Sequence, residues 1–356
     1  MYSKLFSTLQ IKSISLKNRI AISPMCQYSS EDGFANDWHL VHLGSRASGG
    51  AGLIIQEATA VSPEGRISPE DVGIWKDEHI EKLQEITRFI KSQNAVAGIQ
   101  LAHAGRKASS ASPWNGGRKV AVENGGWATV APSAIGLHEN DMAPFALDKT
   151  GIQKVISDFK AATKRAVQAG YQLLEIHAAH GYLLHQFMSP LSNLRTDEYG
   201  RSFENRIRLT MEVLEAVQSE WPKDLPLFVR ISATDWADGG WNIEESIQLS
   251  KILKEKGVDL IDVSSGGAVS HQQIPLGPNY QVPFAEQIKK ETGILTGAVG
   301  LITKSDQAEE ILASGKADLV LFARESLRNP NLGLTFAQEL NADVPWPKQY
   351  ERAKNK

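Results

Sequence analysis

The sequence predicts a single α/β domain folded as a (β/α)8 TIM barrel. Eight short apolar runs recur along the chain, and segments with apolar residues at helical spacing separate most of them. Runs without strict alternation are typical of strands that are buried on both faces of a parallel sheet. The runs span residues 19–23, 52–58, 95–101, 171–177, 225–231, 258–263, 293–299 and 317–322.

The helical segments support the same fold. They span residues 78–91, 152–169, 204–220, 244–256 and 305–313, and Gly170, Gly257 and Gly315 follow three of them as helix stops. Strands alternating with helices predict a barrel. A doubly wound sheet is the alternative, but it would normally carry a G-x-G-x-x-G fingerprint after an early strand, and none follows any of the eight runs.

Three segments lie outside this alternation. Residues 10–16 alternate polar and apolar positions, which predicts a small N-terminal hairpin that closes one end of the core. The segment of about 102–150 has little periodicity and follows the third strand, so we expect it to cover the barrel mouth as a lid. The alternative is a surface loop without a functional role. Residues 341–356 form a C-terminal tail of the same domain, 1–356.

Composition narrows the class of protein. The 356 residues are 42% hydrophobic and 22% charged, which is typical of a globular chain. A formal net charge of −3 argues against a nucleic-acid surface held by bulk electrostatics. Cys26 is the one cysteine, the N-terminus lacks an apolar signal core, and no apolar run has the length of a membrane span. We therefore expect a cytoplasmic protein.

The fourth strand ends in the most informative stretch of the chain. His177, His180 and Tyr182 lie within six positions, where strand ends of a barrel face the catalytic mouth. Two hydrogen-bond donors and one weak acid are suited to binding an oxygen atom by hydrogen bonds and donating a proton. The pair of histidines could instead be half of a metal site, which would need a third ligand, or two structural histidines. We predict no metal site.

The last two strands end in a phosphate-binding pattern. Gly300 follows the seventh strand and Ala323-Arg324 the eighth, where barrels commonly bind a phosphate. A flat cofactor anchored there would lie near Gln100 and Arg230, which suit the edge of an isoalloxazine ring. Both could instead be core polar groups or members of salt bridges, and a buried Arg230 would require an anionic or strongly accepting partner.

These residues resemble the old yellow enzyme family of FMN-dependent ene-reductases, in particular its bacterial branch with a cysteine under the flavin. The resemblance covers nearly the whole chain, and its most specific pieces are residues 23–30 (SPMCQYSS), 98–107 (GIQLAHAGRK) and 175–202. The chain departs from the commoner pattern at Arg201 and Ala323, where many relatives have glycine. The resemblance implies FMN contacts from Ser23, Pro24, Met25, Cys26, Ala58, Gln100, Arg230, Gly300, Ala323 and Arg324.

The resemblance also implies a reaction. NADPH would reduce the flavin, which would pass the hydride to an activated alkene, an α,β-unsaturated carbonyl or nitro compound. His177 and His180 would donate hydrogen bonds to the substrate's oxygen, and Tyr182 would protonate the substrate's α-carbon. Cys26 would tune the flavin's redox potential, unless it is a structural cysteine; Tyr28 and Lys107 would contact the substrate. The tail would place Arg352 in a neighbour's site within a homodimer or homotetramer, the alternative being an ordinary frayed tail.

Two rival functions remain open. One is another FMN barrel with a different acceptor, such as a dihydroorotate-type dehydrogenase. The other is a flavin-binding or sensing protein without turnover. Relatives that use an iron–sulfur cluster are excluded, because a single cysteine cannot ligate one.

Overall fold

The structure, a computed structural model, describes residues 3–354. Eight parallel strands close into a barrel in the order β3-β4-β5-β8-β9-β10-β11-β12, with β12 paired back to β3. This confirms the predicted fold class, and every predicted apolar run forms one strand. The strands are β3 Ile20–Ile22, β4 Leu53–Ala60, β5 Val96–Ala102, β8 Leu173–Ala178, β9 Leu227–Ser232, β10 Leu260–Ser264, β11 Leu295–Ala298 and β12 Leu319–Phe322.

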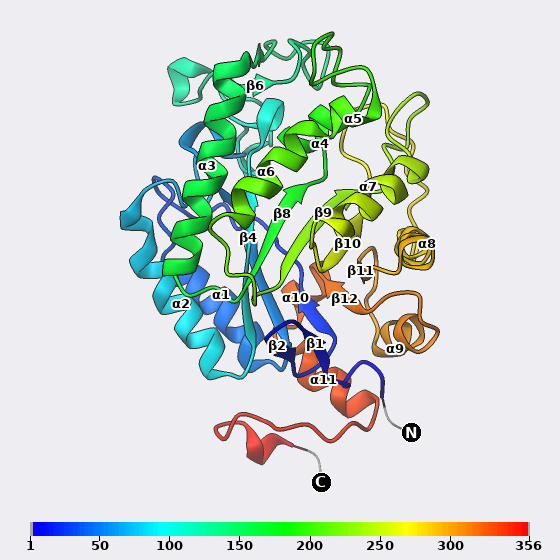
Figure 1. The fold of residues 1–356 in the computed structure, drawn as a ribbon. Helices are drawn as coiled ribbons and strands as arrows, with labels where there is room; N and C mark the ends of the chain where they lie inside the picture. The colour runs from blue at the N-terminus through cyan, green and yellow to red at the C-terminus, as the bar shows by residue number, and fades with distance from the viewer. Residues whose placement is uncertain (1–2, 355–356) are drawn as a thin grey trace.

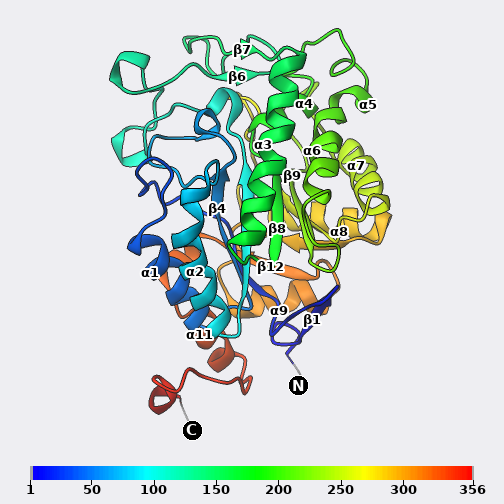
Figure 2. The ribbon, with the colours of Figure 1, turned by 60° about the vertical axis from the view of Figure 1, so that its left-hand side comes forward.

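Helices surround the barrel, as Figures 1 and 2 show from two sides. Two predicted segments differ in detail, since α3 begins earlier than expected and the segment 204–220 divides into α5 and α6. Two helices of the outer ring, α1 and α8, were not predicted. The helices are α1 Asp37–Ser48, α2 Ile80–Ser92, α3 Lys149–Gln168, α4 Leu183–Met188, α5 Phe203–Arg206, α6 Arg208–Gln218, α7 Ile243–Glu255, α8 Val282–Thr292, α9 Ser305–Ala313, α10 Arg324–Arg328 and α11 Leu332–Glu339.

The N-terminal hairpin closes the barrel, as predicted. Strands β1 (Leu9–Ile11) and β2 (Ile14–Leu16) pair antiparallel across a turn at Lys12 and Ser13. Leu9, Ile11 and Leu16 pack with residues from inside the barrel, such as Phe228. In Figure 1 the hairpin lies at the end of the barrel from which the strands start. The opposite end, where the strands finish, is called the mouth below.

The segment between β5 and α3 has little regular structure. It contains the 3-10 turns Gly105–Lys107, Pro113–Asn115 and Val122–Asn124 and the short pair β6 (Val130–Ala131) and β7 (Phe145–Ala146). Both views place it over the mouth end of the barrel. Its movement as a lid stays a prediction.

The tail after α11 runs along the hairpin end, away from the mouth (Figure 1). It ends in a 3-10 turn at Glu351–Ala353. Within residues 3–354 no helix combines the length and apolar character needed to cross a bilayer.

Candidate active site at the barrel mouth

His177 is held as a neutral hydrogen-bond donor. It is the last inward-facing residue of β8, and its register partner on β9 is Arg230. Its Nδ1 accepts the backbone N–H of Ala179 at 3.3 Å, so in the neutral ring the hydrogen lies on Nε2. Burial, followed by the positive charge of Arg230, holds the pKa of His177 well below its usual value. The ring can therefore donate from Nε2 without carrying a charge.

A left-handed turn brings the next two rings over the first. His180 and Gly181 have φ values of 57° and 69°, and a Cβ on Gly181 would lie 1.9 Å from the Gly267 carbonyl oxygen. The His180 backbone N–H donates to Ser232 Oγ at 2.9 Å, and its Nε2 lies 2.7 Å from Ser264 Oγ. Burial lowers the pKa of His180 as well, so this ring is also neutral.

The turn delivers Tyr182 to His177. The two ring centroids lie 4.9 Å apart, and His177 and His180 lie 5.1 Å apart, with all three rings nearly perpendicular. Burial raises the pKa of Tyr182 well above its usual value, so the phenol keeps its proton at neutral pH. Two neutral imidazoles and one protonated phenol therefore converge at the mouth, as the spacing of the sequence indicated.

Lys107 supports this turn from the segment that follows β5. Its Nζ donates to the His180 carbonyl oxygen at 2.7 Å and lies 5.6 Å from the centre of the Tyr182 ring. Burial, with the nearby charges of Arg106 and Lys119, lowers the pKa of Lys107 to about 8. The structure thus gives Lys107 a backbone partner; contact with substrate stays a prediction.

The loop after β3 forms another wall of the mouth. Ser23 is buried, while Pro24, Met25, Cys26 and Tyr28 are half-buried. Glu57 fixes the loop, because its Oε2 accepts the Gln27 backbone N–H at 2.7 Å. Burial, then the charges of Asp71 and Glu57, raises the pKa of Cys26, which is therefore a neutral thiol. The Tyr28 ring meets Trp114 edge-on at 5.7 Å, which joins this loop to the 102–150 segment.

Beneath the mouth lies a buried belt, formed by Gln100, Glu175, Arg230 and Asp262 on four adjacent strands. The anionic partner that Arg230 required is Asp262, whose Oδ2 lies 3.3 Å from Arg230 Nε. Arg230 Nη1 also donates to Ser23 Oγ at 3.1 Å. Sequence reasoning missed Glu175 and Asp262, which could have been found as acidic residues inside otherwise apolar strands. Ala58, on the adjacent strand β4, is buried and is the register partner of Gln100.

A cavity of about 250 Å³ lies between the ends of the last strands. Its lining includes three of the residues expected to contact the cofactor, Gly300, Ala323 and Arg324, and also Arg328, Tyr280 and Gln281, which the sequence analysis did not name. Gly300 has a φ of 123°, and a Cβ there would lie 2.9 Å from Gln281 Nε2. The space beside Gly300 and the two arginines of α10 suit a phosphate group. We call this cavity the phosphate cradle.

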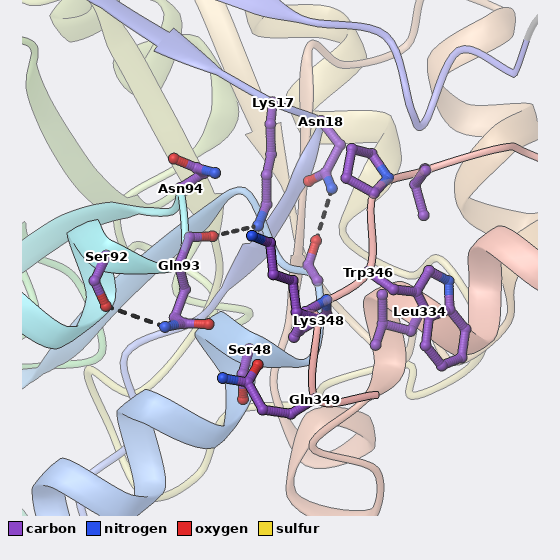
Figure 3. Close-up of a pocket in the computed structure, with 15 residues that line it drawn as sticks. Lys17, Asn18, Ser48, Ser92, Gln93, Asn94, Leu334, Trp346, Lys348 and Gln349 are labelled. Atoms are coloured by element: carbon purple, nitrogen blue, oxygen red, sulfur yellow. Dashed lines mark hydrogen bonds between the residues drawn. The ribbon is translucent and has the colours of Figure 1, made fainter. Parts of the chain in front are cut away.

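A larger cavity, of about 570 Å³, lies far from these groups, at the hairpin end (Figure 3). Tail residues such as Trp346 and Lys348 face Lys17 and Gln93 across it, and Lys17 Nζ donates to the Gln93 carbonyl oxygen at 3.1 Å. Burial lowers the pKa of Lys17 to about 8. The cavity marks where the tail lies along the barrel, and the converging donors place the active site at the mouth instead.

Two further predictions concern the tail residue Arg352 and metal binding. Arg352 is exposed in the last turn of the tail, at the end of the barrel opposite the mouth, so it does not join its own chain's site. Among residues 3–354, no three histidine, cysteine, aspartate or glutamate side chains gather as metal ligands.

The fold and site together are those of a TIM-barrel protein with a cavity that suits a phosphate group and a mouth that presents two neutral imidazoles and a phenol. Residues 4–343 match the NADH:flavin oxidoreductase / NADH oxidase family, and the chain belongs to this family. It is 49% identical over 354 residues to an NADPH dehydrogenase of Bacillus subtilis, with 99% of each chain covered. An NADPH dehydrogenase of Listeria innocua is 48% identical over 353 residues, again with 99% of each covered.

Solved structures give the same grouping. Morphinone reductase in complex with tetrahydroNAD matches with a TM-score of 0.79 and 27% identity, over 98% of this chain and 93% of that one. The old yellow enzyme homologue from Zymomonas mobilis matches with a TM-score of 0.78 and 27% identity, over 97% and 94% of the two chains. The chain is an oxidoreductase of the old yellow enzyme family, and FMN and NADPH are its cofactors.

The described residues fit FMN. The phosphate cradle offers two arginines and a backbone approach at Gly300 that a side chain would block. Arg230 lines this cradle and is the register partner of His177, while Gln100 lies on β5, the strand next to β8, so polar groups that suit the ring's heteroatoms lie near both sites.

Proposed function

We propose that this enzyme is an NADPH-dependent ene-reductase that reduces activated alkenes, namely α,β-unsaturated carbonyl and nitro compounds. The observation that carries the proposal is the convergence of two neutral imidazoles and one protonated phenol at the mouth. Bound FMN would supply the hydride-transfer chemistry that links NADPH to the β-carbon of the alkene.

Each side chain then has a task. His177 donates from Nε2, and His180 joins it, to the carbonyl or nitro oxygen of the substrate, which draws electron density away from the β-carbon. Tyr182 gives its phenolic proton to the α-carbon. Neutral imidazoles suit this task, because they stabilise charge that develops on the oxygen without attracting anions beforehand.

The cofactor contacts are part of the proposal. The phosphate would occupy the cradle at Gly300, Ala323 and Arg324, while Gln100 and Arg230 meet the ring's pyrimidine edge. Ser23, Pro24, Met25, Cys26 and Ala58 would line the rest of the ring, with the neutral Cys26 thiol tuning its potential. Tyr28 and Lys107 would border the substrate.

We also propose a homo-oligomer, a dimer or tetramer acting in the cytoplasm, in which the tail reaches a neighbour's site. Arg352 supports this, because it is exposed in the turn Glu351–Ala353 and the tail that carries this turn lies at the end of the barrel opposite the mouth.

Product analysis tests the substrate class. With NADPH and 2-cyclohexenone under anaerobic conditions, we expect cyclohexanone in an amount equal to the NADPH consumed. NADPH oxidation that proceeds with a quinone or oxygen but yields no saturated ketone would favour another FMN barrel dehydrogenase. FMN binding without any turnover would favour the flavin-binding alternative.

A further inference from the structure

Glu175 is a fully buried acid that the proposed mechanism does not use. It lies on β8, two residues before His177, so both side chains point into the barrel. Its register partner on β5 is Gln100, and Gln100 Nε2 donates to Glu175 Oε1 at 2.7 Å. On the other side of the belt, Asp262 is the register partner of Arg230. Glu175 thus lies between Gln100, a proposed cofactor contact, and the charged pair Arg230 and Asp262.

The carboxyl oxygens of Glu175 and Asp262 have too few hydrogen-bond donors unless one of the two acids carries a proton. One of their four oxygens accepts from Gln100. Glu175 Oε2 and both oxygens of Asp262 lack a hydrogen-bond donor among the described residues, although Asp262 Oδ2 lies 3.3 Å from Arg230 Nε. The two carboxyl groups are within hydrogen-bonding reach of each other. A proton between them would supply one donor and satisfy two buried oxygens.

The charges give the same result. Arg230 is the one cation of the belt, so two ionised acids would leave a buried excess negative charge, which is costly. Burial, followed by the charge of Asp262, raises the pKa of Glu175 well above its usual value. Burial also raises the pKa of Asp262, but Arg230 acts against that rise. The proton therefore belongs to Glu175.

We propose that Glu175 and Asp262 share one proton, carry a single negative charge against Arg230, and so make Glu175 the positioning residue for Gln100. The proton on Oε2 is donated to Asp262, which leaves Oε1 as a carbonyl oxygen that accepts the Gln100 amide. Gln100 then presents its own carbonyl oxygen in a fixed orientation, and Arg230 presents a charge that is largely balanced. This inference rests on the proposed function in one respect, since it takes Gln100 and Arg230 as the flavin's neighbours.

Two substitutions at Glu175 test the positioning role through the affinity for FMN. Glu175→Gln can still donate to Asp262 and accept from Gln100, so its dissociation constant for FMN should match the wild-type value. Glu175→Met keeps the length but removes both bonds, and FMN should bind about tenfold more weakly or worse. Equal affinity in Glu175→Met would overturn the positioning role. If Glu175→Gln binds FMN as weakly as Glu175→Met does, the proposal that Glu175 is protonated is overturned.

Thr296→Val is the matched control. Thr296 is fully buried on β11, next to β10, but its register partner Ile261 packs outside the barrel, so its side chain faces away from the belt. This variant should bind FMN as the wild type does. Far-ultraviolet circular dichroism of each apoprotein shows whether a variant has folded, and the infrared band of a protonated carboxylic acid should disappear in Glu175→Gln.

The reduction potential of bound FMN tests the single charge. In Asp262→Asn the remaining acid can ionise, so either single amide variant keeps one negative charge and a nearly wild-type potential. The double variant Glu175→Gln/Asp262→Asn leaves Arg230 without a counter-charge and should raise the potential, by about 30 mV for each tenfold gain in relative affinity for the reduced flavin. Additive shifts in the two single variants would mean two ionised acids and overturn the shared proton.

These measurements need no alkene, which separates the two proposals. A wild-type protein that takes up no FMN would overturn the proposed cofactor contacts and this inference together. A wild-type protein that binds FMN and reduces enones, with Glu175→Met equal to it in FMN affinity, would overturn this inference alone.

Discussion

At the residue scale, the chemistry of the mouth depends on which atoms already have partners. His177 Nδ1 is occupied by the Ala179 backbone N–H, so its Nε2 is the atom left to donate. His180 adopts a left-handed conformation, uncommon for a residue with a side chain, because the turn is held by Ser232 and by Lys107. Backbone contacts thus fix the donors before substrate arrives, and such preorganisation favours catalysis.

Tyr182→Phe should separate the two half-reactions. The substitution removes the phenolic proton but keeps the ring beside His177. Oxidation of the reduced enzyme by 2-cyclohexenone should slow by on the order of a hundredfold, while reduction by NADPH changes little. Stopped-flow absorbance measures both rates. Tyr199→Phe, which removes a hydroxyl bound to Glu212, is the control. Equal slowing of both steps in Tyr182→Phe would contradict the role of proton donor.

Cys26 should react slowly with alkylating agents at neutral pH. Its thiol pKa is raised by burial, so the reactive thiolate forms only at higher pH than in a free cysteine. In the apoprotein, the rate of iodoacetamide alkylation should stay below that of a cysteine peptide from about pH 7 to pH 9 and rise beyond. Added FMN should suppress the reaction further. Alkylation as fast as in the peptide, or no effect of FMN, would contradict this account of the thiol.

The residues of the site were predictable to the extent that they sit at strand ends. His177 lies at the end of its strand, and His180, Tyr182, Gly300 and Arg324 lie within four residues after theirs, so the barrel rule alone brings them to one end. Glu175 and Asp262 could not be paired in the same way, because their contact crosses the barrel interior and depends on strand register. Arg328 was missed for a related reason, since it reaches the phosphate cradle only because α10 turns there.

At the scale of elements, the strands were easier to predict than the helices. Each strand is a run of buried apolar residues, which the sequence displays directly. Helix α1 was missed because its buried face includes His39, His42 and Arg46, which obscure the apolar periodicity. Helix α4 is buried on all sides and has no amphipathic pattern. Helix α8 carries signals that could have found it, a proline at its start and Gly293 at its end.

The hairpin should contribute to stability and not to chemistry. Leu16 is 1% exposed and packs inside the barrel at the end opposite the mouth. Leu16→Ala should lower the free energy of unfolding by about 2–5 kcal/mol through lost burial and a cavity. Its visible flavin spectrum and its rate with NADPH should stay those of the wild type. Thermal unfolding at saturating FMN measures the effect, with the exposed Ser15→Ala as control. An unchanged melting temperature would mean that the hairpin does not plug the barrel.

At the scale of the whole molecule, the tail is the segment that we expect to act in the proposed oligomer and not in its own chain's site. Its middle part packs at the hairpin end near Lys17, while Arg352 remains exposed beyond it. A chain that stops after Gln349, or the variant Arg352→Ala, should associate more weakly or bind enone with a higher KM. Sedimentation velocity and steady-state kinetics measure the two effects. If both variants keep the wild-type assembly state and KM, the tail is an ordinary surface segment.

The central claim is that one barrel mouth performs both half-reactions through FMN. The visible absorption spectrum of the purified holoprotein tests it most directly, recorded before and after anaerobic NADPH and again after 2-cyclohexenone. We predict a yellow protein that NADPH bleaches and the enone restores. A protein that bleaches but stays bleached with the enone would contradict the ene-reductase assignment, and one that NADPH cannot bleach would contradict the whole account of the mouth.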